Sequence, residues 1–98
     1  MKPMGNTILI TGGGSGIGAA LAHRLHDQGN RVIVTGRRPE ALAATIAGRA
    51  NMTALPLDVA DPAAIPAFAA EVTARHPDLN VVINNAGIVR GNHYFWET

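Results

Sequence analysis

Residues 7–18 read TILITGGGSGIG, an apolar run that ends in a cluster of glycines. The apolar run is typical of a buried strand, and Ile17, Leu21 and Leu25, spaced by four, predict a helix after the glycines. Amides at the start of a helix carry roughly half a positive charge, and glycines let a pyrophosphate approach the backbone. Glycine clusters also form ordinary tight turns. The position between a strand and a helix favours a dinucleotide-binding turn.

Short apolar runs alternate with helical patterns along the rest of the chain. Parallel strands joined by right-handed crossovers are expected from this alternation, in a truncated βαβαβαβ, Rossmann-type doubly wound α/β sheet with strand order 3-2-1-4. Pro56 donates no ladder hydrogen bond, which fits an outer edge for the third strand. Asp61 is the expected N-cap of the third helix. Strands are predicted at 7–11, 31–35, 53–57 and 80–84, and helices at 16–28, 39–48 and 62–76.

The end of the chain lacks a clear pattern. Residues 88–98 are polar and aromatic without a period and are expected to form an irregular tail, within a partial dinucleotide-binding domain over residues 1–98. The fourth strand is apolar and continuous, and no strand is predicted on its far side. An uncovered edge invites pairing with another chain, so we expect self-association, through this edge or through the third helix.

Composition narrows the class of protein. The 98 residues suit one domain, and 47% hydrophobic residues argue against disorder. A net charge of +1 without a basic block does not favour nucleic acid as a partner. The absence of cysteine excludes disulfides and thiolate catalysis. No signal-peptide pattern or apolar run of about 20 residues is present, so we expect a cytoplasmic protein without a membrane partner.

Two histidines are candidate metal ligands. His23 and His26 lie three apart on the first predicted helix, but no third ligand is spaced to join them. We therefore expect surface histidines and no metal site.

Three separated segments together resemble one family. Residues 11–18, Asp58 with Val59, and residues 84–87 are similar to the N-terminal half of short-chain dehydrogenases/reductases, and the resemblance spans about residues 5–90. It implies a nicotinamide dinucleotide as cofactor. Asn84 is expected to brace the sheet. The resemblance assigns the pyrophosphate turn to Gly12, Gly16 and Gly18, the adjacent cofactor lining to Gly14, Ser15 and Ile17, the adenine to Asp58 and Val59, and the ribose to Asn85, Ala86 and Gly87.

The end of the second strand bears on the choice of cofactor. An acidic residue about 20 positions past the glycine turn would bind a ribose 2′-hydroxyl and favour NAD. This chain has Gly36 there, followed by Arg37 and Arg38. A guanidinium pairs bidentately with a 2′-phosphate, so we predict NADP, with NAD the less favoured cofactor. The alternative is that one or both arginines are solvated loop residues.

The family's catalytic residues are not found. The resemblance implies a tyrosine with a lysine four residues on, whereas Tyr94 is followed at that distance by Thr98 and the one lysine is Lys2. No residue is therefore assigned a catalytic role, and we predict no turnover from this chain alone. Two interpretations remain. The favoured one is the cofactor-binding part of an NADP-dependent oxidoreductase transferring hydride between nicotinamide and a carbonyl or alcohol; the other is a non-catalytic dinucleotide-binding or oligomerising module.

Overall fold

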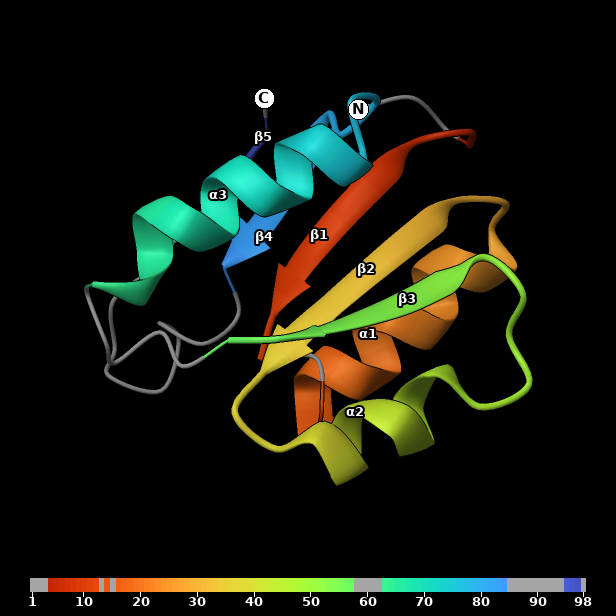
Figure 1. The fold of residues 1–98 in the computed structure, drawn as a ribbon. Coiled ribbons are helices and arrows are strands. Elements are labelled where there is room, and N and C mark those ends of the chain that lie inside the picture. Colours follow the sequence, from red (N-terminus) through yellow and green to blue (C-terminus); the bar gives the residue numbers. More distant parts are fainter. Residues whose placement is uncertain (1–3, 13, 15, 58–62, 85–94, 98) are drawn as a thin grey trace.

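A computed structural model of the chain describes residues 4–12, 14, 16–57, 63–84 and 95–97. The strands form one sheet in the order β3-β2-β1-β4-β5, and the first four are mutually parallel (Figure 1). This confirms the predicted α/β fold and its 3-2-1-4 order. The elements are β1 (Thr7–Thr11), α1 (Gly16–Asp27), β2 (Arg31–Gly36), α2 (Pro39–Ile46), β3 (Met52–Pro56), α3 (Ala64–Arg75), β4 (Val81–Asn84) and β5 (Phe95–Glu97).

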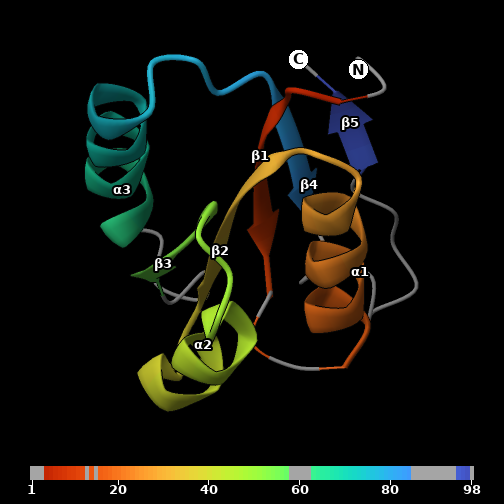
Figure 2. The ribbon, with the colours of Figure 1, turned by 90° about the vertical axis from the view of Figure 1, so that its right-hand side faces the viewer.

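Helices cover both faces of the sheet. Figure 2 shows α1 and α2 on one side and α3 on the other. Because side chains alternate along a strand, β1 and β2 contribute to a cluster on each face, which explains their continuous apolar runs. The buried members include Ile8, Ile10, Val32, Val34, Ala22, Leu25 and Leu42 on the α1/α2 side, and Leu9, Ile33, Leu55 and Val72 on the α3 side.

The outer strand β3 lies where the proline requires it. β3 pairs with β2 alone among the described strands, and Pro56 is in register with Gly36 at its end. The Leu57 amide then donates to the Gly36 carbonyl oxygen at 2.8 Å. The prediction that Pro56 marks an edge strand is confirmed.

The other end of the sheet differs from expectation. β5 runs antiparallel to β4, from Val81 opposite Glu97 to Ile83 opposite Phe95. Two predictions are therefore wrong: residues 88–98 are not irregular throughout, and the far edge of β4 is not uncovered. The unpaired backbone groups along an apolar strand favour pairing with any nearby segment. A three-residue strand is too short to show a period of its own.

The third helix is shorter than predicted, and fewer of its apolar residues face the sheet than expected. It begins at Ala64 with Ala63 as its N-cap. The expected cap, Asp61, lies outside the described residues. Val72 is buried and Phe68 packs beside it, but Ile65, expected on the same inward face, is 44% exposed. No helix among the described residues is long and apolar enough to cross a membrane.

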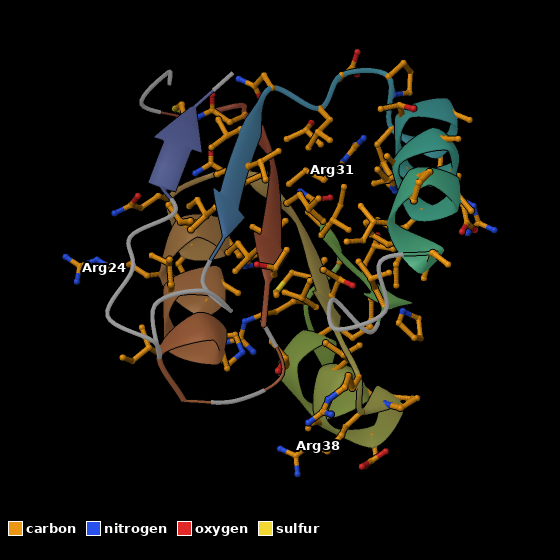
Figure 3. The ribbon with its side chains drawn as sticks, turned by 90° about the vertical axis from the view of Figure 1, so that its left-hand side faces the viewer. Arg24, Arg31 and Arg38 are labelled. Carbon is orange, nitrogen blue, oxygen red and sulfur yellow. The ribbon has the colours of Figure 1, made fainter. Side chains whose placement is uncertain are left out.

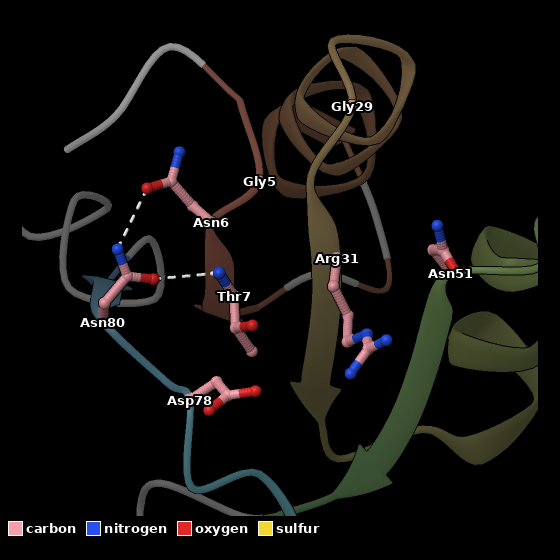
Figure 4. Close-up of a pocket in the computed structure, with 8 residues that line it drawn as sticks. All are labelled: Gly5, Asn6, Thr7, Gly29, Arg31, Asn51, Asp78 and Asn80. Carbon is pink, nitrogen blue, oxygen red and sulfur yellow. Dashed lines mark hydrogen bonds between the residues drawn. The ribbon is translucent and has the colours of Figure 1, made fainter.

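Three asparagines join the amino-terminal ends of the strands, and we call them the asparagine network: Asn6, Asn30 and Asn80. The Asn6 backbone amide and its Nδ2 both donate to Asn30 Oδ1, at 3.0 and 2.9 Å. Asn30 Nδ2 donates to the Leu25 carbonyl oxygen at 2.8 Å. Asn80 Nδ2 donates to Asn6 Oδ1 at 2.9 Å, and Asn80 Oδ1 accepts from the Thr7 amide at 2.8 Å (Figure 4). The network links the starts of β1, β2 and β4 to the end of α1.

Candidate functional site

The glycine turn leaves β1 and leads into α1 at the carboxyl end of the sheet. The Gly12 amide donates to the Thr35 carbonyl oxygen of β2 at 2.8 Å, which ties the turn to the neighbouring strand. Gly12 and Gly16 have φ of +72° and +52°, values that other residues adopt only with strain. The first turn of α1 holds no acidic residue, so nothing within it offsets the positive end of the helix dipole.

Gly14 brings this turn against α2. A Cβ placed on Gly14 would lie 3.3 Å from Ala41 Cβ and 3.4 Å from Leu42 Cδ2. The absent side chain therefore allows the turn to lie directly on the start of α2. Gly18 is buried, whereas Ile17 is 71% exposed and free to contact a ligand.

A cavity of about 340 Å³ lies between this turn and the β2–α2 connection. Both arginines of the predicted pair line it, and both are exposed. Figure 3 shows Arg38 extending outward beside α2. The fold thus brings the glycine turn and the arginine pair together. The lining residues are Gly12, Gly14, Gly36, Arg37, Arg38, Ala41 and Leu42.

These residues fit a phosphorylated nucleotide. Gly12 and Gly14 line the cavity without side chains, so a phosphate can approach the backbone closely. The guanidinium groups of the two arginines that line the cavity are suited to pair with a second phosphate. Glu40, in the first turn of α2, is exposed and does not line the cavity. The local charge therefore favours an anion.

Sequence reasoning missed the α2 wall of the cavity. Leu42 is 1% exposed and belongs to the core cluster, and Ala41 beside it matches no motif. Their contact with Gly14 joins positions 27 and 28 residues apart, a separation that no local pattern reports. The available signal was Pro39, which begins α2 directly after the arginines and so places its first turn beside them.

The two histidines of α1, expected at the surface, are both half-buried and differ in their contacts. His23 is half-buried, and its Nε2 lies 2.8 Å from the Thr45 carbonyl oxygen of α2. His26 Nδ1 lies 3.2 Å from Oδ1 of the neighbouring Asp27. The ring of His23 contacts α2, and the sequence of α1 alone does not predict a contact with another helix. Within the described part of the chain, no three His, Asp or Glu side chains gather to hold a metal ion.

Asn84 is the last described residue of β4, and several other residues named above lie outside the described residues. The backbone of Asn84 in β4 is in register with Thr11 of β1, and the Asn84 side chain is not described. Outside the described residues lie Ser15, Asp58, Val59, Asn85, Ala86, Gly87 and Tyr94.

A larger polar hollow, of about 500 Å³, lies at the amino-terminal ends of the strands (Figure 4). Arg31 and Asp78 line it together with residues of the asparagine network. In open parallel sheets, ligands bind beyond the carboxyl ends of the strands. The candidate nucleotide site is therefore the smaller cavity, beside the glycine turn.

Comparisons with known proteins agree with this fold. The family model for short chain dehydrogenases matches residues 6–97. The chain is 44% identical over 88 residues to an uncharacterized oxidoreductase, DltE, of Bacillus subtilis, covering 90% of this chain and 35% of that protein. It is 39% identical over 85 residues to an NADP-dependent 3-hydroxy acid dehydrogenase, YdfG, of Salmonella typhi, covering 86% and 34%.

Solved structures give the same result. A short-chain dehydrogenase from Streptomyces avermitilis superposes with a TM-score of 0.78 at 40% identity, covering 89% of this chain and 32% of that one. Actinorhodin polyketide ketoreductase with NADPH gives 0.74 at 33% identity, covering 83% and 33%. The chain thus spans about a third of the length of these relatives. It belongs to the short-chain dehydrogenase/reductase family of oxidoreductases.

Proposed function

We propose that this chain binds NADP in preference to NAD, as the cofactor-binding part of an oxidoreductase that exchanges hydride between nicotinamide and a carbonyl or alcohol. The observation that carries the proposal is the cavity shared by the glycine turn and the arginine pair. Two relatives support it by their names: one is an NADP-dependent dehydrogenase and another is a ketoreductase with NADPH.

The charges at the end of β2 argue for the phosphorylated cofactor. Gly36 provides no carboxylate to accept hydrogen bonds from a ribose 2′-hydroxyl. A 2′-phosphate would instead meet Arg37 and Arg38, whose planar guanidinium groups match its oxygens. The half-positive start of α1 would receive the pyrophosphate.

A non-catalytic dinucleotide-binding module is the second candidate. It is favoured by the sequence, in which Tyr94 lacks a lysine four residues on and Lys2 is the one lysine. A positioned proton donor is needed for general acid catalysis at a carbonyl. We expect these 98 residues to bind the dinucleotide without reducing a generic carbonyl substrate.

Exchange of one arginine tests the proposal. Arg37→Asp should raise the dissociation constant for NADPH by roughly tenfold or more, because a carboxylate repels the 2′-phosphate, and should leave NADH binding within about twofold. Titration by nucleotide fluorescence measures both constants.

Arg24→Asp is the matched control. Arg24 is an exposed arginine of α1 that does not line the cavity, and Figure 3 shows it extending outward beside α1, apart from Arg38 beside α2. Equal losses of NADPH and NADH affinity in Arg37→Asp, or an equal effect of Arg24→Asp, would refute the assignment.

A further inference from the structure

We propose that His23 is a positioning residue for cofactor selectivity, acting through α2 on the 2′-phosphate cavity. The inference rests on the function proposed above and extends it to a side chain that does not line the cavity. Its starting observation is the 2.8 Å contact between His23 Nε2 and the carbonyl oxygen of Thr45.

This contact is a hydrogen bond of defined direction. A carbonyl oxygen only accepts, so Nε2 carries the proton. Thr45 lies in the last turn of α2, where the carbonyl ends of the peptide dipoles favour a donor. Thr45 is buried and His23 is half-buried, so water competes little for the bond.

The helix that receives this bond depends on tertiary contacts. α2 has only eight residues, and an isolated helix of fewer than about 12 is marginal in water. Leu42, 1% exposed, anchors it in the core cluster that includes Ala22 and Leu25 of α1. The His23 bond ties its far end to the same helix, α1, next to Ile46, which is partly buried and packs against the same cluster.

The anchors make α2 a short lever. At 1.5 Å per residue, Thr45 lies about 4.5 Å along the axis beyond Leu42, and Arg38 lies about 6 Å on the other side. If α2 tilts about Leu42 when the His23 bond is lost, Arg38 moves by about as much as Thr45 does, in the opposite direction. Ala41 would also move against Gly14, which allows little room at the contact described above.

Selectivity between the two dinucleotides follows from which residues move with α2. The arginine side of the cavity sits at the start of α2, whereas the expected pyrophosphate turn begins α1. Tilting α2 should weaken contacts with a 2′-phosphate most, because Arg37 and Arg38 directly precede this helix, whereas it meets the pyrophosphate turn at Gly14. NADPH binding therefore depends on His23 more strongly than NADH binding does.

Donorless and donor-retaining variants of His23 test this in the whole 98-residue chain. His23→Leu keeps apolar bulk but no donor, and should lower the ratio of NADPH to NADH affinity by about three- to tenfold, measured by nucleotide fluorescence. His23→Gln supplies an amide donor and should restore the ratio to within about twofold of the wild type. His26→Leu, three residues along the same helix, should leave it unchanged.

A ligand-free measurement provides a second readout. The Leu42 amide donates to the Arg38 carbonyl oxygen at 3.1 Å, so its hydrogen exchange reports on the first turn of α2. Exchange should be faster in His23→Leu and close to wild type in His23→Gln and His26→Leu. Unchanged exchange in His23→Leu would overturn the inference without any dinucleotide.

The outcomes separate the two proposals. If the wild type does not prefer NADPH, or Arg37→Asp leaves that preference intact, the proposed function fails and this inference fails with it. If both hold, yet His23→Leu leaves the ratio unchanged or weakens both dinucleotides equally, only the role of His23 is overturned.

Discussion

Thr35 is a residue whose chemistry does not match its surroundings. It lies in β2 between Thr11 and Leu55 of the neighbouring strands and is 0% exposed. Its carbonyl oxygen accepts from the Gly12 amide, but its hydroxyl has no hydrogen-bond partner among the described residues. A buried hydroxyl without a partner is destabilising, because it has lost its hydrogen bonds with water. The core would therefore accept an apolar side chain of the same shape here.

Thr35→Val should raise the free energy of unfolding by about 1 kcal/mol, since it removes the buried hydroxyl and keeps the branched shape. Urea denaturation of the chain measures the change. Thr45→Val is the control, because the Thr45 hydroxyl donates to the Ala41 carbonyl oxygen at 3.1 Å and its removal should bring no gain. A loss of stability in Thr35→Val would mean that its hydroxyl is satisfied in solution.

Among the elements, the amino-terminal strand ends are joined by polar side chains. Asn30 follows Gly29, whose φ of +94° ends α1, and its side chain is buried at the start of β2. Its Oδ1 accepts from two nitrogens of Asn6 while its Nδ2 binds the Leu25 carbonyl oxygen. The Asn30 side chain thus joins the end of α1 to the starts of β1 and β2.

Asn30→Ala should lower the free energy of unfolding by about 2–3 kcal/mol, because it removes a buried partner from several polar groups at once. The control is Asn51→Ala, an exposed asparagine at the same edge, for which a change within about 0.5 kcal/mol is expected. Chemical denaturation of both variants gives the comparison. Equal effects would show that the asparagine network contributes nothing specific to stability.

Elements set by local signals were predictable from the sequence. β1 follows the apolar run before Gly12, α2 begins at Pro39, and the edge position of β3 follows from Pro56. The half of the candidate site formed by glycines and arginines was predictable for the same reason. The α2 wall and the bond from His23 were not, because they join residues more than 20 positions apart through packing.

At the scale of the whole molecule, the sheet ends differ. β3 presents an outer edge that stops at Pro56, whereas β4 is covered by the three residues of β5. We also propose that β5 limits self-association by occupying the edge through which another chain would add.

Deletion of residues 95–98 tests that proposal. Without β5, the outer backbone groups of β4 lose their partners, and a second copy of the chain can supply a strand in the same place. The shortened chain should therefore show a larger dimer fraction than the intact chain at tens of micromolar in sedimentation velocity. Glu97→Ala, which keeps the β5 backbone, should behave as the intact chain does. Equal dimer fractions in the shortened and intact chains would show that copies do not meet at the β4 edge, which leaves α3 as the other predicted contact surface.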